Sequence, residues 1–152
     1  MPKKVMVSGC LLGIKCRFDG TSKEMPDLGA ALQDYRVIPF CPEVSGGLKI
    51  PRLPAEIQNG TGAAVLNGKA RVLNQAGEDC TDQFTKGAAA VLKLVEQHQP
   101  EFVILKAKSP SCGVGKIYDG SFSGKLRDGD GVTTALLRSA GVKVYSEVDR
   151  PK

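Results

Sequence analysis

The sequence predicts an α/β fold: a Rossmann-like three-layer sandwich with a mostly parallel sheet and an inserted β-hairpin. Short β-branched apolar runs recur along the chain, amphipathic helical patterns alternate with them, and one Asn-Gly turn signal stands outside this alternation. Strands that alternate with helices form βαβ units, whose strands run parallel in one sheet. The length of 152 residues suits a single domain, 1–152, with its own core.

Four apolar, β-branched runs are expected to form the buried strands of the sheet. Each is short and bounded by polar or turn residues, as is typical of strands in a parallel sheet. They are "KKVMVSG" at 3–9, "DYRVIPF" at 34–40, "EFVILKA" at 101–107 and "VKVYSE" at 142–147.

Three amphipathic patterns between these runs predict helices. The first helix begins at Pro26, the second follows Thr81 as its N-cap and ends before Pro100, and the third spans 132–140 with Gly141 after it. The first two carry apolar residues three and four positions apart, on one face of a helix. These residues are Leu28, Ala31, Leu32 and Tyr35 in the first helix, and Phe84, Ala88, Val91 and Val95 in the second.

The segment "AAVLNGKARVL" at 63–73 differs from the helical and strand patterns around it. Asn67-Gly68 stands between two short apolar runs, and this dipeptide is the strongest local signal for a two-residue hairpin turn. The sequence therefore predicts an inserted β-ribbon that turns at Asn67-Gly68.

Charge and composition narrow the classes of function. The formal charge of +5 is spread along the chain among acidic residues, which indicates weak attraction for phosphate more than a nucleic-acid surface. With no Trp, three Tyr and five Phe, the chain has little material for a base-stacking platform. The apolar run near the start is too short for a signal peptide, and no segment approaches the ~20 apolar residues of a membrane span. We expect a cytoplasmic location and no membrane partner.

Five cysteines without a secretory signal indicate reduced thiols that serve as ligands or nucleophiles. Cys10 and Cys41 directly follow the first two predicted strands, and Cys112 follows the third by a few residues. The carboxyl ends of parallel strands meet at one edge, where open α/β sheets bind ligands. A lone strand-end cysteine is more often an inert core thiol, but three such residues favour a shared site. Three soft thiolates suit zinc or an iron-sulfur cluster and leave one metal position open.

The two other cysteines are expected to be structural. Cys80 lies before the second helix, away from the predicted strand ends. Cys16 lies six residues after Cys10, and we interpret it first as a packed neighbour of the site. A fourth ligand and a redox partner of Cys10 are its alternative roles. The sequence contains no C-x-x-C motif, so zinc ribbons and thioredoxin-like chemistry have no support.

Three other motifs fail on inspection. "SPSCGVGK" at 109–116 is not a P-loop, because Pro110 replaces the first glycine and Ile117 replaces the magnesium-binding hydroxyl. "DGDG" at 128–131 is not a calcium loop, because Val132 occupies the fifth position and no Glu closes the loop. The single histidine, His98, lies in the last turn of the second predicted helix, so a Cys-His dyad is disfavoured.

Carboxylates are better placed than histidine for proton transfer. Glu43 stands two residues after Cys41, and a partly desolvated carboxylate beside a metal is suited to carry a proton. For Glu56 a surface salt bridge or a loop anchor is favoured over chemistry. Asp19 and Asp119 lie in "FDG" and "YDG" turn signals, and ligand binding is an equal alternative to a turn role at both.

Four stretches together resemble the bacterial thiouracil desulfidase family, over essentially the whole chain. They are "SGCLLGIKCRFDG", "CPEVSGGLKIPRLPAEI", "SPSCGVGKIYDGSFSG" and "GVTTALLRSAGVKVYSE". The resemblance implies an oxygen-sensitive 4Fe-4S cluster held by three cysteines, with the fourth iron free to bind the sulfur of the substrate. It implies Cys10, Cys41 and Cys112 as the ligands, Glu43 as the acid/base carboxylate and Ser109 as an active-site hydroxyl.

The expected reaction is non-redox: thiouracil and water give uracil and hydrogen sulfide. Larger relatives with an additional domain are associated with thiolated tRNA, so a free thiolated pyrimidine base, nucleoside or nucleotide is favoured here, with tRNA a less favoured partner. The expected substrate contacts are Ser111, Lys108 and Asp119, and Lys106 and Lys116 are further candidates for a 5′-phosphate. Both a monomer and a homodimer are compatible with the sequence.

Three other functions stay open at the level of sequence. The first is another cluster-based sulfur-transfer enzyme with the same ligand set. The second is a nucleic-acid-binding sensor that contains a cluster or zinc, although the chain shows neither clustered basic residues nor a helix-turn-helix pattern. The third is a thiol redox enzyme, which would need a disulfide between Cys10 and Cys16.

Overall fold

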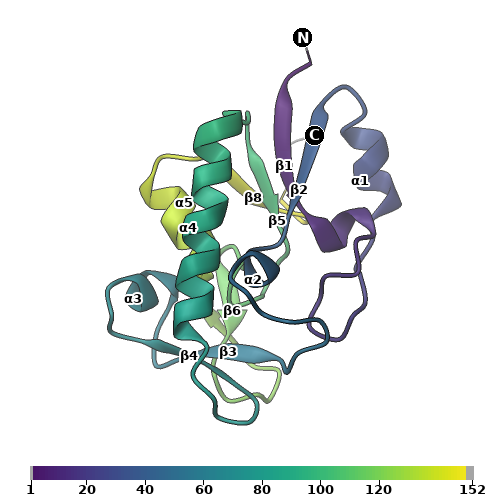
Figure 1. Ribbon diagram of the computed structural model, residues 1–152. Coiled ribbons are helices and arrows are strands. Elements are labelled where there is room, and N and C mark those ends of the chain that lie inside the picture. The colour runs from purple at the N-terminus through teal and green to yellow at the C-terminus, as the bar shows by residue number, and fades with distance from the viewer. Residues whose placement is uncertain (1, 150–152) are drawn as a thin grey trace.

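The central sheet has four parallel strands in the order β2-β1-β5-β8 (Figure 1). The computed structural model describes residues 2–149. The strands are β1 (Lys4–Ser8), β2 (Arg36–Phe40), β5 (Val103–Leu105) and β8 (Val144–Ser146). All four coincide with the apolar runs that the sequence predicts, and their parallel pairing confirms the predicted sheet.

Helices cover both faces of this sheet, as the predicted three-layer sandwich requires (Figure 1). Successive side chains of a strand point to opposite faces. Val5 and Val7 pack with the 3-10 helix η1 (Gly9–Leu12) and α1 (Pro26–Ala31). Met6 packs on the other face with α4 (Thr81–His98) and α5 (Val132–Ser139). The alternation along β1 therefore joins both helical layers through the middle of the sheet.

The second and third predicted helices are confirmed, and the first is shorter than its pattern. α4 buries its whole predicted apolar face, although Cys80 and not Thr81 is its N-cap residue. α5 ends one residue early at Ser139, and Gly141 follows with a φ of 81°. α1 ends at Ala31, so Leu32 and Tyr35 lie beyond the helix. Tyr35 packs against Phe102, with ring centroids 5.5 Å apart.

The inserted antiparallel ribbon exists, but its turn is not at Asn67-Gly68. It pairs β3 (Ala55–Gln58) with β4 (Arg71–Asn74), and a short helix, α3 (Gly62–Leu66), lies between the two strands. The Thr61 hydroxyl caps this helix by accepting from the Ala64 amide, and Asn67 and Gly68 end it. The predicted turn is wrong because a positive-φ glycine after an asparagine serves a helix C-terminus as well as a hairpin.

Three further elements, which the sequence did not predict, surround the carboxyl edge of the sheet. α2 (Pro42–Ser45) follows β2 directly, and β6 (Lys116–Tyr118) pairs antiparallel with β7 (Leu126–Asp128).

Within residues 2–149 no helix has the length and apolar character needed to cross a membrane.

Two glycines bring the backbone of α2 into direct contact with α4. A Cβ atom at Gly46 would lie 1.9 Å from the Gln83 carbonyl oxygen, and one at Gly87 would lie 1.9 Å from the Pro42 carbonyl oxygen. No side chain fits at either position. The long helix therefore fixes the place of the short helix that carries Glu43.

We expect Gly87→Ala to lower the free energy of unfolding by about 1–3 kcal/mol, because the methyl group overpacks the contact with α2. Gly29→Ala is the matched control, because Gly29 lies in α1 with open space around its Cβ position. Helix propensity alone should make this control up to about 1 kcal/mol more stable. Urea unfolding of both variants checks the opposite signs, and equal effects would contradict the role of the α2–α4 contact.

Candidate functional site

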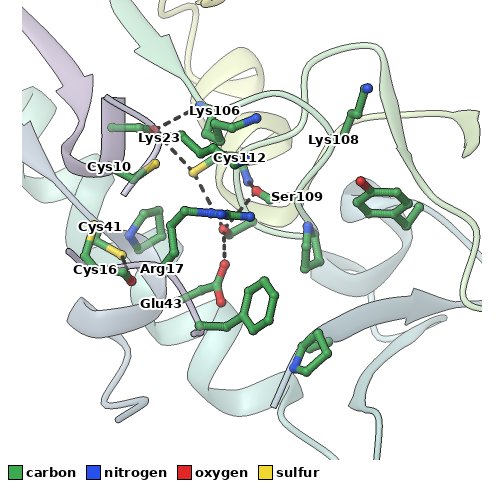
Figure 2. A pocket seen from close by; sticks show the side chains of 18 of the residues that line it. Cys10, Cys16, Arg17, Lys23, Cys41, Glu43, Lys106, Lys108, Ser109 and Cys112 are labelled. Atoms are coloured by element: carbon green, nitrogen blue, oxygen red, sulfur yellow. Dashed lines mark hydrogen bonds between the residues drawn. The ribbon is translucent and has the colours of Figure 1, made fainter. Parts of the chain in front are cut away.

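The carboxyl edge of the sheet opens into a cavity of about 600 Å³, the size range of small-molecule sites. Cys10, Cys16, Cys41 and Cys112 all line it, and Figure 2 shows these four side chains gathered together. Cys10, Cys41 and Cys112 thus meet at one edge of the sheet, as their positions after the predicted strands indicated. Their role as ligands stays a prediction.

Strand register explains why the predicted ligands meet. β1 pairs with β2 so that Ser8 lies opposite Phe40, and Cys10 and Cys41 follow these two residues. β5 lies on the other side of β1, and the Lys106 amide at its end donates to the Ser8 hydroxyl over 3.0 Å. The loop after β5 then carries Cys112 back over the same edge.

Hydroxyl groups and burial set the state of the Cys112 thiol. The Ser8 hydroxyl donates toward its Sγ over 3.7 Å, and the Ser111 hydroxyl, which donates to Glu43 over the shorter distance of 2.8 Å, lies 3.6 Å from the same sulfur. Burial nevertheless dominates and raises the pKa of Cys112 to about 12. Metal coordination would deprotonate such a thiol, since the thiolate is the ligand.

Cys16 lies beside Cys10 and Cys41 at the cavity. Its side chain lowers the pKa of Cys10 and, together with burial, raises the pKa of Cys41, and the Cys41 thiol donates to the Cys16 carbonyl over 3.8 Å. The Cys16 side chain is buried. This placement is compatible with a packed neighbour, and that role for Cys16 stays a prediction. Cys80 packs in a separate apolar cluster with Ile57 and Phe84, in agreement with a structural role.

The donor set suits a sulfur-ligated metal group. Among residues 2–149, no three His, Cys, Asp or Glu side chains are placed to hold a single metal ion. Cys10, Cys41 and Cys112 nevertheless face one cavity with soft donors, and the Lys106 ammonium favours the thiolate form of Cys10. Soft thiolates of this kind ligate iron-sulfur clusters.

Glu43 is held at both of its carboxylate oxygens. The Arg52 Nε atom donates to Oε1 over 3.1 Å, and the Ser111 hydroxyl donates to Oε2 over 2.8 Å. The Arg52 and Glu43 side chains are 9% and 16% exposed, so water screens this pair only in part. The carboxylate predicted to carry a proton is thus fixed in place at the cavity.

Arg52 also ties together two segments that frame the cavity. Its Nη2 atom donates to the Cys16 carbonyl over 2.9 Å, and its Nη1 atom donates to the Lys49 carbonyl over 3.3 Å. Arg52 is not among the site residues predicted from the sequence. Its one available signal was an arginine in the proline-rich segment between Glu43 and Glu56, which does not reveal a partner.

The two predicted serines form a short path to Glu43. The Ser109 hydroxyl accepts from the Cys112 amide over 2.8 Å and lies 3.4 Å from the Ser111 hydroxyl. Ser111, which is 2% exposed, in turn donates to Glu43. The structure thus brings both serines together with the carboxylate, with Ser111 next to it.

The remaining predicted residues lie toward the mouth of the cavity or outside it. Lys106 and Lys108 line the cavity, and Lys106 pairs with Glu147 over 3.0 Å. Lys116 pairs with Asp128 away from the lining. Asp119 also lies outside the lining, and its carboxylate accepts from the Ser121 amide over 2.9 Å.

Two further carboxylates have structural contacts. The Asp19 carboxylate accepts from the Thr21 amide over 3.1 Å, as its turn signal suggests. Glu56 is buried and accepts from the amides of Gly120 and Phe122 over 2.9 and 3.2 Å. This is the loop anchor favoured from the sequence, although Glu56 also reaches the cavity lining.

Comparisons with known proteins agree with this arrangement. Residues 5–149 match the family described as 2-thiouracil desulfurase. The chain is 46% identical over 143 residues to the uncharacterized protein YbbK of Bacillus subtilis (strain 168), covering 94% of this chain and 95% of that protein. It also matches the solved structure of a [4Fe-4S]-dependent thiouracil desulfidase, TudS, at 42% identity and a TM-score of 0.83, covering 96% of this chain and 91% of that chain.

We expect Arg52→Ala to lower the free energy of unfolding by about 3 kcal/mol, because it leaves the shielded Glu43 carboxylate without its cation. Arg71→Ala is the matched control. The Arg71 guanidinium meets Asp79 only at 4.0 Å, with side chains 77% and 48% exposed, so its loss should cost no more than about 0.5 kcal/mol. Thermal and urea unfolding compare the two variants, and a loss of equal size in both would contradict the role of Arg52.

Proposed function

Because the chain belongs to the 2-thiouracil desulfurase family, we propose that it is an iron-sulfur-dependent desulfidase acting on thiolated pyrimidines. The proposed reaction is non-redox, and thiouracil plus water gives uracil plus hydrogen sulfide. One observation carries the proposal: Cys10, Cys41 and Cys112 line the same cavity as the doubly held carboxylate of Glu43. The likeness to a solved [4Fe-4S]-dependent thiouracil desulfidase supports it.

The proposed cofactor is a 4Fe-4S cluster held by Cys10, Cys41 and Cys112. When bound through three thiolates, such a cluster supplies an open iron that acts as a Lewis acid on the thiocarbonyl sulfur. Cys16 lies beside Cys10 and Cys41 and packs against the ligands in this proposal. Lys106, which pairs with Glu147, also lies near Cys10 and favours its thiolate form, after the larger effect of Cys16.

Glu43 carries the proton of the reaction. Replacing sulfur by oxygen at a ring carbon requires that water lose both of its protons and that the departing sulfide gain two to leave as hydrogen sulfide, so a carboxylate near the ring can serve both transfers. Arg52 holds this carboxylate in one orientation through Oε1. Ser111 contacts Oε2, and Ser109 follows it, so the two hydroxyls can orient the attacking water.

The substrate enters from the side where Lys108 lines the cavity. Ser111 would contact the ring edge, because its hydroxyl already lies between Glu43 and the Cys112 sulfur. A 5′-phosphate on the substrate would meet Lys108, an exposed residue of the lining. Asp119 contributes indirectly in this proposal, by shaping the loop next to the cavity through its bonds to Ser121.

We expect protein purified and reconstituted without oxygen to contain about four irons and four acid-labile sulfides per chain, as a 4Fe-4S cluster requires. It should release sulfide from 2- or 4-thiouracil or a corresponding nucleotide. Zinc alone, no metal, or a full cluster without desulfuration of any thiopyrimidine would refute the proposed function.

Single replacements test the ligand set. Cys10→Ala, Cys41→Ala and Cys112→Ala should each abolish iron binding, because each removes one of the proposed thiolate ligands. Cys80→Ala is the control, because Cys80 packs in a separate apolar cluster, and it should retain the iron content of the wild type. Iron retained by Cys112→Ala but lost from Cys80→Ala would show the ligand assignment to be wrong. Iron and sulfide analysis of the anaerobic proteins provides the measurement.

Glu43→Gln should keep the cluster and lower kcat by about 10²–10⁴, because an amide cannot transfer the proton. Ser109→Ala should lower kcat less, since Ser109 reaches Glu43 only through Ser111. Rates of sulfide release, normalised to iron content, check both variants. Wild-type kcat in Glu43→Gln would exclude this carboxylate as the proton carrier.

A further inference from the structure

The aromatic side chains of this protein divide into two groups. The chain has five Phe and three Tyr. The larger group packs in the apolar clusters and comprises Tyr35, Phe40, Phe84, Phe102 and Tyr145. Of these, the buried Phe40 also reaches the cavity lining. Phe18, Tyr118 and Phe122 belong to none of the apolar clusters found among residues 2–149, are only partly buried, and line the cavity that contains the cysteines.

Phe122 occupies a backbone conformation that its side chain disfavours. Its φ is 56°, in the left-handed region, where a bulky residue is an outlier that the surrounding structure must enforce. Glycine would adopt the same conformation without strain. An aromatic residue at this position therefore suggests a use for its side chain beyond the shape of the loop.

Glu56 enforces this conformation from β3. Its Oε1 atom accepts from the amides of Gly120 and Phe122 over 2.9 and 3.2 Å, and the carboxylate is buried. Gln58, on the same strand, donates from Nε2 to the Gly120 carbonyl over 2.9 Å. A Cβ atom at Gly120 would lie 2.7 Å from the Ile57 carbonyl oxygen, so the loop lies directly on β3.

Phe18 is fixed through Arg52, the residue that holds Glu43. The Arg52 amide donates to the Phe18 carbonyl over 2.6 Å, while its guanidinium binds the Glu43 carboxylate. The Arg17 guanidinium lies 5.5 Å from the Phe18 ring centroid and covers part of that ring. The backbone of Phe18 is therefore tied to the segment that also orients the proposed proton carrier.

We propose that Phe18, Tyr118 and Phe122 form an aromatic surface that binds the planar ring of the substrate, with Phe122 as the main specificity-determining residue and Glu56 as its positioning residue. This inference rests on the proposed function for the identity of the ring. Aromatic side chains stack on any flat π-system and ignore the substituents at its edge. The surface therefore selects flat heterocycles over saturated or acyclic thiocarbonyl compounds that carry the same C=S group.

This selection can be tested with the cluster-containing enzyme and two substrates that differ in planarity. For the wild type, 5,6-dihydro-2-thiouracil, whose ring is puckered, should have a KM at least about tenfold above that of 2-thiouracil. Phe122→Leu keeps an apolar side chain but removes the π-face, so it should raise the KM for 2-thiouracil about tenfold and remove most of this preference. Because stacking binds substrate and transition state alike, kcat should change much less.

Two further variants separate an effect on ring binding from an effect on folding or on cluster content. Glu56→Leu removes the acceptor of both loop amides and should raise KM as Phe122→Leu does, with unchanged iron content. Val148→Ala is the control, because Val148 is 79% exposed and lies outside the cavity lining. It should leave KM, kcat and the preference for the planar ring unchanged.

A binding measurement that needs no turnover uses Phe122→Trp. The chain has no tryptophan, so this variant reports from one position only. Adding uracil, the product without sulfur, to the loaded protein should change its tryptophan fluorescence saturably, whereas 5,6-dihydrouracil should act only at concentrations about tenfold higher.

The outcomes distinguish this inference from the proposed function. Unchanged KM and ring preference in Phe122→Leu, together with no fluorescence response of Phe122→Trp to uracil, would overturn the aromatic surface while desulfuration itself stands. A saturable response to uracil and 2-thiouracil without sulfide release from any thiopyrimidine would instead refute the desulfidase and retain the ring-binding surface. If Phe122→Leu does not fold, the fluorescence titration of Phe122→Trp alone decides whether the aromatic surface binds the ring.

Discussion

The contact between Arg52 and Glu43 is the interaction on which the arrangement of the site depends. A carboxylate shielded from water beside sulfur ligands is costly unless a cation and hydrogen bonds compensate it. Arg52 supplies both and joins Glu43 to the Cys16 carbonyl and, through its own amide, to Phe18. The charge that the proposed chemistry needs is thus held by the same residue that holds two segments of the cavity.

The frame behind this contact is rigid because it consists of backbone packed on backbone. β1 lies between β2 and β5, so the segments after these strands start from adjacent points at one edge of the sheet. α2 continues from β2 and packs against α4 at Gly46 and Gly87, where even a methyl group would clash. Residues that precede and follow short buried elements of this kind are held more precisely than residues on long loops.

The parts of this structure that could be predicted from sequence are those with local, periodic signals. The four strands, the long helix and the meeting of Cys10, Cys41 and Cys112 follow from apolar patterns and the geometry of parallel sheets. The turn at Asn67-Gly68 was wrong because the dipeptide reports a positive φ and not the element that contains it. Arg52 was missed because the two partners that place it in the site, Glu43 and the Cys16 carbonyl, are nine and 36 residues away in the chain. The small number of aromatic residues argued against a stacking platform, but composition does not show that Phe18, Tyr118 and Phe122 line one cavity.

The cavity combines two kinds of recognition that constrain a ring in different ways. An aromatic surface fixes the plane of a flat heterocycle but leaves it free to rotate within that plane. On the proposed function, a thiolate-bound metal group would attract the sulfur, and the Ser111 hydroxyl and Glu43 carboxylate would meet the ring edge, so these groups would set the rotation that the stack leaves open. On the proposed function, a ring bearing sulfur at either of two edge positions can therefore lie in the same plane and turn its sulfur toward the cysteines. The aromatic surface then selects the class of ring, while the cysteines and Glu43 select the atom that reacts.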